Sequence, residues 1–402
     1  MDKFRKPVDN PVRTRSLPVD NGTAAHIARD NLSPMTPTGL LRPMLVPGLA
    51  RVWRGPHTLQ LGLDPARAVL IDLPDPRAAG VLDLLDGVRP ERLVLAQAAA
   101  AGVTADDTHA LLDTLHRSGF VLPGPSLLPC TLPDDRRRRL TGEAAALALE
   151  RRRPGGASVE PDRSPTPARL LRRRGAARVV ISGPGRLAAP IAVALAEAGV
   201  GHVHAEVSGA VGTSELPGGP LRAGDVGRSR AEAITAAVRR VAPGVETHAV
   251  RRGAASLVIQ LGHDQPVALL AAGHARRGQA HLAVTIREGC PVVGPLVPPT
   301  GRPCLQCVSL HRRDRDAGWP ETAGRLPGTG IEPCAVATLL AATGYATAEA
   351  LACLDGGSPE TLGAAVEISA PGRFRRRTWP PHPDCPCASA RSTWRAGTRL
   401  GG

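Results

Sequence analysis

Residues 177–201 read ARVVISGPGRLAAPIAVALAEAGVG, and this stretch decides the fold. A short apolar run typical of a buried strand leads into a turn with Gly183 and Gly185, and an alanine-rich helical pattern follows. Together with Ala188, the turn fits the pattern G-x-G-x-x-G/A in the strand–turn–helix context that this pattern requires. The first glycine makes the tight turn, the second lets a phosphate approach the backbone, and the small third residue lets the helix pack on the strand. The free N–H groups at the start of the helix favour an anion.

Strands and helices continue to alternate across residues 177–390, which predicts a doubly wound, mostly parallel α/β sheet. Dinucleotide-type folds usually hold the ribose with an acidic residue at the end of the second strand. Here Glu206 is the acidic residue at that end, and strand alternation directs it to the face opposite Val207. The segment therefore has two interpretations: a nucleotide site, or a plain connection in an inherited fold.

The composition describes a globular chain of 402 residues with a formal net charge of +14. This charge suits an anionic partner, but the arginine runs are not interleaved with aromatic residues, so we do not expect nucleic acid to be the partner. The N-terminus lacks a secretory signal, and no apolar run approaches the roughly 20 residues that span a bilayer. We therefore expect a cytoplasmic protein with no membrane partner. In a reducing cytosol, eight cysteines favour metal ligands or buried thiols over disulfides.

Two cysteine pairs predict a zinc site. Cys304 and Cys307 form a C-x-x-C pair, whose two thiolates commonly bind one tetrahedral ion, and Cys385 and Cys387 supply a second pair. His382 is a substitute ligand if one of these cysteines fails. A closed site of four thiolates is structural, because it leaves no open position for catalysis. The alternative is a redox-active C-x-x-C, which prefers to follow a strand and open a helix.

The residues outside the α/β domain divide into four parts. Residues 1–40 are polar and without periodicity, so we expect them to be disordered. Residues 41–125 show three strand patterns and then three helical patterns, which predicts a small winged-helix-like α+β unit. We expect a linker with one helix at residues 126–176 and a disordered tail at residues 391–402. From its pattern, the α+β unit is either a dimerisation or structural module, or a site of peptide capture at an exposed strand edge.

Three motifs of the α/β domain resemble the ThiF-like, ubiquitin-activating superfamily. Residues 196–201 read AEAGVG, similar to the family's A-x-x-G-V-G, and residues 225–231 read DVGRSRA, similar to its D-V-G-x-x-K/R-A. The two cysteine pairs match the family's zinc site. The resemblance covers roughly half of the chain, and it implies that Arg230 occupies the position of the basic residue that contacts the phosphates of ATP.

With the α+β unit in front, the arrangement resembles the leader-peptide-binding partner of azoline-forming cyclodehydratases, which act in thiazole/oxazole-modified peptide biosynthesis. This resemblance implies that the N-terminal unit captures the leader of a precursor peptide as an added strand. It also implies that the ThiF-like part docks a YcaO-type cyclodehydratase, and such proteins are commonly homodimers. We expect the peptide to contact the third strand and the last helix of the unit, at Leu70, Ile71, Leu73, Leu112, Leu115 and Arg117.

Several positions depart from those of an active adenylating member of the superfamily. Arg186 stands where such a member has glycine, and Val207 stands near the position of its aspartate. Residues 260–263 read QLGH in place of D-x-x-D, which leaves Asp264 as the nearby acid. A bulky cation in the turn obstructs the approach of a phosphate to the backbone, and missing acids leave ribose or metal contacts unmade. We therefore expect a non-catalytic scaffold.

Two other functions remain open. An active adenylyltransferase would use ATP on a C-terminal carboxylate and would depend on Arg230, and a basic nucleic-acid binder would show a steep salt dependence of its affinity. If ATP binds, the residues that we expect around it are Gly183, Gly185, Arg186, Ala188, Glu206, Arg230 and Asp264.

Overall fold

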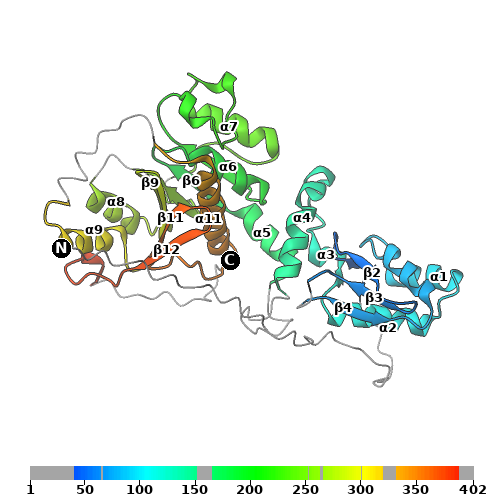
Figure 1. Cartoon of the computed structure of the whole chain (residues 1–402). Helices are drawn as coiled ribbons and strands as arrows, with labels where there is room; N and C mark the ends of the chain where they lie inside the picture. The colour runs from blue at the N-terminus through cyan, green and yellow to red at the C-terminus, as the bar shows by residue number, and fades with distance from the viewer. Residues whose placement is uncertain are drawn as a thin grey trace, which may run out of the picture. The chain divides into compact units, whose positions relative to one another are not determined.

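The computed structural model describes residues 40–64, 67–151, 165–251, 253–262, 266–299, 301–319 and 332–388. The disorder expected for residues 1–40 and 391–402 therefore falls, except at Leu40, outside the described residues. The chain divides into two compact units. The first contains the described residues of Met1–Gly124 and Ala148–Pro161, and the second those of Pro125–Leu147 and Asp162–Gly402. Figure 1 colours the elements of both along the chain.

The first unit contains the three strands followed by three helices that the sequence predicts, although the first of these helices is a 3-10 helix. Strands β2, β3 and β4 form an antiparallel sheet in that order, and β1 pairs with β5 in a separate ladder. The bounds are β1 (Pro43–Leu45), β2 (Arg51–Trp53), β3 (Thr58–Leu61), β4 (Val69–Asp72), η1 (Pro76–Leu84), α1 (Glu91–Ala100), α2 (Ala105–Arg117) and β5 (Val121–Pro123).

Strand alternation builds the core of the first unit. Leu59 and Leu61 of β3 and Ile71 of β4 are buried, whereas the residues between them are half-buried. Helix α2 adds Leu112 and Leu115, whose exposed fraction is 0%. These side chains form one apolar cluster, so the α+β unit has a hydrophobic core of its own.

The segment 126–176, expected to be a linker with one helix, differs from that prediction because it contains two long helices. Helix α4 spans Asp134–Glu150 and helix α5 spans Pro167–Ala176, after the short helix α3 (Gly124–Leu127). Helix α5 begins where the hydroxyl of Thr166 accepts a hydrogen bond from a backbone N–H one turn later. Pro167 is the first residue of α5, where proline leaves no intrahelical hydrogen bond unmade, so this proline marks a helix start.

The second unit is built on a seven-stranded sheet in the order β12-β11-β10-β9-β8-β6-β7. Strands β6 to β9 pair in parallel, and β10, β11 and β12 extend the sheet with antiparallel pairs. This is the doubly wound α/β sheet that the sequence predicts, with an antiparallel extension that the sequence pattern does not predict. The bounds are β6 (Arg178–Ser182), β7 (His202–Glu206), β8 (Leu257–Gln260), β9 (His281–Arg287), β10 (Cys290–Val297), β11 (Ala364–Ala370) and β12 (Arg373–Thr378).

Helices cover both faces of this sheet. Val292 and Val293 are adjacent in β10, so their side chains point to opposite faces. Val293 packs in the core that contains α6 and α11, whereas Val292 packs with Val308 of α9. The bounds of the helices are α6 (Ala188–Glu197), η2 (Thr213–Glu215), η3 (Ala223–Asp225), α7 (Arg230–Val241), α8 (Val267–Arg276), α9 (Leu305–Arg315), α11 (Val336–Leu354) and η4 (Pro386–Ala388).

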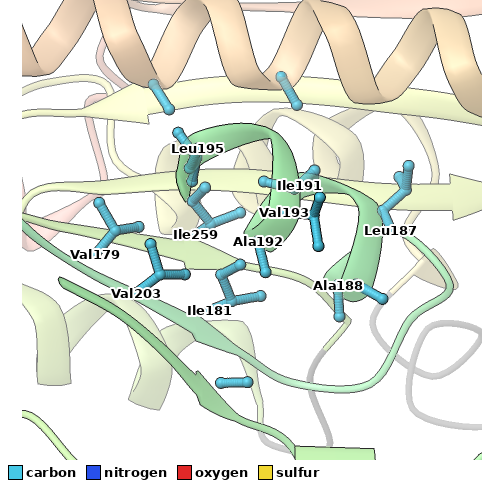
Figure 2. Packing of buried hydrophobic residues seen from close by; sticks show 14 of the residues in the cluster. Val179, Ile181, Leu187, Ala188, Ile191, Ala192, Val193, Leu195, Val203 and Ile259 are labelled. Carbon is cyan, nitrogen blue, oxygen red and sulfur yellow. The ribbon is translucent and has the colours of Figure 1, made fainter. Parts of the chain in front are cut away.

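The main core lies between α6 and the first strands of the sheet. Figure 2 shows Ile191 and Leu195 of α6 close to Val179 and Ile181 of β6 and Ile259 of β8. All five side chains have an exposed fraction of 0%. The many alanines of α6 let its backbone approach the sheet closely, and the larger aliphatic side chains fill the space between.

Helix α11 is the one helix among the described residues that is long and apolar enough to cross a membrane, with a mean hydropathy of 1.3. Leu339, Ala342, Ala346 and Ala350 recur on it at helical spacing and are buried in the main core. This face packs against α6 and β10. The apolar composition of α11 is therefore explained by its position as a core helix.

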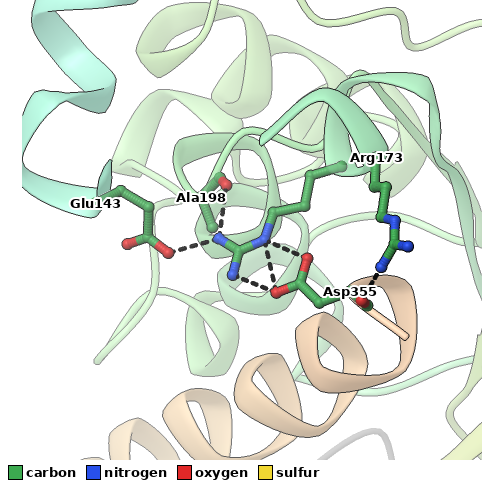
Figure 3. A network of polar contacts seen from close by, with 5 residues as sticks. Glu143, Arg173, Ala198 and Asp355 are labelled. Carbon is green, nitrogen blue, oxygen red and sulfur yellow. Dashed lines mark hydrogen bonds and ion pairs between the residues drawn. The ribbon is translucent and has the colours of Figure 1, made fainter. Parts of the chain in front are cut away.

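A buried guanidinium joins the ends of several helices in the second unit. Arg174 of α5 is 3% exposed, and it forms ion pairs with Asp355 at 2.7 Å and with Glu143 at 2.5 Å. Its Nη1 also donates to the carbonyl oxygen of Ala198 at 3.1 Å (Figure 3). Asp355 caps α11, Glu143 lies on α4 and Ala198 caps α6. Because a charge buried this deeply needs its partners, these elements are held together as a set.

Replacing Arg174 with methionine should lower the free energy of unfolding by about 3–5 kcal/mol, because Asp355 then keeps its charge in a largely buried position without its partner. Denaturant unfolding followed by circular dichroism measures this. Arg172→Met is the matched control: Arg172 is exposed on the same helix, and its loss should change the free energy by no more than about 0.5 kcal/mol. Equal losses in the two variants would contradict the prediction.

Candidate functional site

The glycine-rich turn joins the end of β6 to the start of α6. Gly183 has a φ of +93° and Gly185 a φ of +153°, a backbone region that favours glycine. A Cβ at Gly183 would lie 2.1 Å from the carbonyl oxygen of Gly262, in the turn after β8. Ala188 begins α6 and is 1% exposed. Both glycines of the turn therefore have backbone angles that favour glycine, and close backbone packing requires Gly183 whether or not a ligand binds.

A carboxylate of the chain itself accepts a hydrogen bond from a backbone amide of this turn. The backbone N–H of Arg186 donates to Oε2 of Glu332 at 2.5 Å. The Arg186 guanidinium donates to the carbonyl oxygens of Glu332 at 3.0 Å and of Cys334 at 3.2 Å. A Cβ at Gly185 would lie 3.5 Å from the Glu332 carboxylate, so this group also lies over the second glycine. A phosphate that needs the Arg186 N–H would have to displace Glu332.

Burial and the neighbouring positive charges shift the pKa of the Glu332 carboxyl group in opposite directions. Burial raises its pKa, and the backbone N–H of Arg186 and the charges of Arg186 and Arg230 lower it by less. Glu332 is not among the site residues that the sequence predicts. Glu332 is one of 36 acidic residues, it lies in an irregular segment, and its partner Arg186 is 146 positions away, so no local pattern distinguishes it.

Arg230, at the start of α7, is also engaged by the chain itself. Its Nε and Nη2 donate to the two carboxylate oxygens of Glu215, each at 2.9 Å. Its guanidinium also donates to the backbone oxygens of Ser208 and Ala210. The hydrogen bonds with Glu215 raise the pKa of Arg230 and fix its planar group in place. A phosphate would have to compete with Glu215 for this side chain.

The other nucleotide positions do not converge on the turn. Glu206 lies at the end of β7 with its side chain exposed, and only its backbone oxygen contacts the turn, at 3.3 Å from the Gly183 nitrogen. Gln260 is 5% exposed, and its Nε2 donates to the backbone oxygens of Ser182 and Gly262 at 3.3 and 3.2 Å. Its neutral amide supplies no charge to a metal ion. Asp264 lies outside the described residues.

The four predicted cysteines come together. The Sγ–Sγ distances are 3.9 Å for Cys304–Cys307, 3.6 Å for Cys304–Cys385 and 3.2 Å for Cys307–Cys387, and all four sulfurs lie within 4.8 Å of one another. A tetrahedral zinc ion with Zn–S bonds of about 2.3 Å separates its sulfurs by about 3.8 Å. The residues therefore fit a closed four-thiolate zinc site, which would join the first turn of α9 to the segment after β12.

Burial and hydrogen bonds shift the pKa values of the clustered cysteines in different directions. Burial raises the pKa of Cys385 to about 11 and also raises the pKa of Cys387. Burial raises the pKa of Cys307 too, but hydrogen bonds from the His382 backbone and the Cys387 thiol lower it by more. A metal ion would favour the thiolate form of all the ligands. Four thiols in one cluster also favour a metal site over a two-cysteine redox pair.

His382, considered as a substitute ligand, has another role in the structure. It is 2% exposed, its Nε2 lies 2.7 Å from Oδ2 of Asp314, and its Nδ1 accepts a hydrogen bond from the Asp384 N–H at 3.1 Å. Both ring nitrogens are therefore used. The His382 carbonyl oxygen accepts from the Cys385 N–H at 3.1 Å, so this histidine shapes the turn that presents the second cysteine pair.

The expected peptide-contact residues have different positions in the first unit. Leu70 is half-buried on β4, whereas Ile71 and Leu73 are 6% and 3% exposed and belong to the core. Leu112 and Leu115 are fully buried, so the prediction that they form the opposing wall is wrong: both point into the core rather than toward a peptide. Arg117 is exposed and forms an ion pair with Asp113 at 2.6 Å.

The open edge of β4 follows from its ladder with β3. The Leu73 N–H donates to the His57 carbonyl oxygen at 2.7 Å, and hydrogen-bonded pairs alternate along an antiparallel ladder. Ile71 opposite Leu59 therefore also bonds to β3, whereas the backbone of Leu70 points away from it. Within the described part of the chain, no strand pairs with this edge. Leu70 thus presents its N–H and C=O at an open sheet edge.

No protein-family model matches the sequence, and no curated protein matches it. Solved structures, however, share this fold across most of the chain. The structure of E. coli MccB with ATP is 15% identical with a TM-score of 0.56, and the match covers 86% of this chain and 99% of that chain. The microcin C7 biosynthetic enzyme MccB in complex with N-formylated MccA matches at 14% identity, with a TM-score of 0.55 and the same coverage. PaaA matches at 15% identity with a TM-score of 0.56, over 83% of this chain and 98% of PaaA. The chain therefore has the ThiF-like fold that its motifs predict.

Cys385→Ser should remove bound zinc and lower the free energy of unfolding by about 4 kcal/mol, because the link between α9 and the segment after β12 is then lost. Elemental mass spectrometry of the purified full chain and thermal unfolding measure the two effects. Cys130→Ser is the control, because this thiol is exposed and lies outside the cluster. Zinc that persists in Cys385→Ser, or is absent from the unmodified chain purified with zinc, would refute the prediction.

Proposed function

We propose that this chain is a cytoplasmic peptide-binding scaffold in the biosynthesis of a ribosomally made, modified peptide. In this function the α+β unit binds the leader of a precursor peptide, and the ThiF-like part presents it to a YcaO-type cyclodehydratase without adenylating anything itself. The observation that carries the proposal is the Glu332 carboxylate on the glycine-rich turn.

The groups that could bind a phosphate at the glycine-rich turn already bind carboxylates of the chain. An active adenylating site needs a free backbone N–H and a free cation for the phosphates of ATP. In this chain the Arg186 N–H is bonded to Glu332 and the Arg230 guanidinium is bonded to both carboxylate oxygens of Glu215. Displacing two buried or half-buried carboxylates from charge-assisted hydrogen bonds opposes nucleotide binding at both positions.

The acids that would hold a nucleotide and its metal ion are also missing from the described site. Gln260 places a neutral amide at the position of an expected aspartate, and Glu206 points its side chain to solvent. A bound Mg²⁺ prefers carboxylate and phosphate oxygens. The described residues therefore supply little to bind MgATP.

The solved relatives support a polypeptide as the bound molecule. MccB has been solved with MccA in N-formylated and selenomethionine-containing forms, and selenomethionine is an amino acid of a polypeptide. The fold match covers 86% of this chain, and this supports our proposal that its ligand belongs to the same chemical class. The four-cysteine site would hold zinc in a structural role.

The Leu70 edge is the place where we propose that the leader peptide docks. A peptide strand added to a sheet gains affinity from main-chain hydrogen bonds, and it gains specificity from side-chain pockets. Leu70 offers these main-chain groups at the open edge of β4.

The second function is an active adenylyltransferase that uses ATP on a C-terminal carboxylate. One observation favours it: E. coli MccB, which shares the fold, has been solved with ATP. The two functions differ in whether nucleotide binds and turns over.

The full, zinc-loaded chain should show no ATP–pyrophosphate exchange with any peptide that it binds. Calorimetry should detect nucleotide binding about tenfold tighter in Glu332→Ala than in the unmodified chain, because removal of the carboxylate frees the Arg186 N–H. Glu197→Ala, which removes an exposed carboxylate at the end of α6, is the control and should leave nucleotide binding unchanged. Exchange by the unmodified chain would establish the adenylyltransferase instead.

Leu70→Pro should weaken peptide binding about tenfold, because proline removes the N–H that points out from the β4 edge. Fluorescence anisotropy with peptides selected from a displayed random library against the full chain measures this. Leu70→Ala keeps the N–H and is the matched control. Ile71→Pro is unsuitable, because the Ile71 N–H belongs to the β3 side of the ladder. Unchanged affinity in Leu70→Pro would place the peptide elsewhere.

A further inference from the structure

A short segment runs beside the last strand of the large sheet and brings three metal-binding side chains together. Strand β7 is the end strand of the sheet, and Glu246 pairs with His202 in a parallel bridge. The Glu246 N–H donates to the Gly201 oxygen and the Glu246 oxygen accepts from the Val203 N–H, both at 2.9 Å. Since side chains alternate along an extended segment, Glu246 and His248 lie on the same side.

The hydrogen bonds of His202 fix which ring nitrogen is free. Its Nε2 lies 2.7 Å from the carbonyl oxygen of His248. A carbonyl oxygen only accepts, so Nε2 carries a hydrogen, and Nδ1 is the ring nitrogen whose lone pair a metal ion would bind. This Nδ1 is buried without a hydrogen-bond partner among the described residues, and it lies 3.4 Å from Oε2 of Glu246. The two potential ligand atoms therefore face each other at a position where His202 is only 5% exposed.

A third donor completes the group. Nε2 of His248 lies 3.9 Å from the same Glu246 oxygen, and the two imidazole rings have a centroid separation of 4.4 Å. The three donor atoms all lie within 4.8 Å of one another. Glu246 and His248 have side-chain exposures of 63% and 69%, so both can adjust around an ion.

We propose that His202 Nδ1, Glu246 and His248 Nε2 form a second metal site, which binds a divalent transition ion of the zinc class. Bonds of about 2.0–2.2 Å in tetrahedral geometry separate neighbouring donors by about 3.3–3.6 Å, which matches the His202–Glu246 distance and needs a small rotation of His248. A metal-binding histidine commonly donates its other N–H to a backbone carbonyl, as His202 does. Imidazole and carboxylate donors suit Zn²⁺, Ni²⁺ or Co²⁺.

This site differs from the four-cysteine cluster in chemistry and consequence. Three ligands leave a coordination position open to water or to a donor from another molecule. The ion would also hold the segment around Glu246 against β7, and this segment covers the outer edge of that strand.

Cobalt titration of the full chain distinguishes the two sites, because Co²⁺ bound by thiolates has an intense charge-transfer absorption and Co²⁺ bound by imidazole and carboxylate does not. The unmodified chain should bind one equivalent with this absorption and a second equivalent without it. In His248→Ala the affinity for the second equivalent should fall by more than about tenfold, while the thiolate absorption stays unchanged.

His204→Ala is the matched control. His204 lies on the same strand and contacts the backbone oxygen of Thr247, but it is not part of the cluster, so this variant should keep the second equivalent. Uptake of cobalt only at the thiolates of the unmodified chain would overturn the proposal. So would equal loss of the second equivalent in His204→Ala and His248→Ala, because the strand edge and not these ligands would then be responsible.

Discussion

The buried guanidinium of Arg174 is the constraint on which the second unit depends. Its side chain binds Glu143, Asp355 and the Ala198 oxygen, and its own carbonyl oxygen accepts hydrogen bonds from the N–H groups of Ala177 and Gly201. Helix α5 leads directly into β6, so these contacts fix where the first strand of the sheet begins. A Cβ at Gly201 would lie 1.9 Å from the Gly175 oxygen, which means that only glycine fits there. The AEAGVG motif therefore serves this junction of helix ends and does not by itself require a nucleotide.

The same distinction between fold and function applies to the glycine-rich turn. Gly183 is required because the Gly262 backbone passes too close for a side chain, and Ala188 is small because α6 packs on the sheet. Both requirements exist without a ligand. The Arg186 N–H of the turn donates to a carboxylate of the chain itself, that of Glu332. The glycine-rich motif therefore identifies the fold, and it does not by itself identify a function.

Two clusters of metal-binding side chains, the four cysteines and the group around His202, contrast in chemistry and in exposure. The four cysteines are gathered from a helix start and from a turn 81 positions away, are largely enclosed, and suit a structural ion. His202, Glu246 and His248 are gathered by pairing of two extended segments at a sheet edge, and two of them are exposed. The cysteine cluster can be predicted from the spacing of the cysteines alone. The group around His202 cannot, because it depends on the register of the strand pairing.

The sequence by itself determined the features whose causes are local. The strand–turn–helix pattern of residues 177–201, the alternation of strands and helices after it, and the strand patterns of the α+β unit all depend on periodicity within a few residues. The sequence also predicted that the two cysteine pairs come together, because two thiolates at C-x-x-C spacing commonly bind one metal ion. Tertiary structure alone decided the rest. It placed Leu112 and Leu115 in the core, it brought Glu332 to Arg186 across 146 positions, and it set which nitrogen of His202 is free. These depend on how distant segments pack, and short-range patterns carry no information about such contacts.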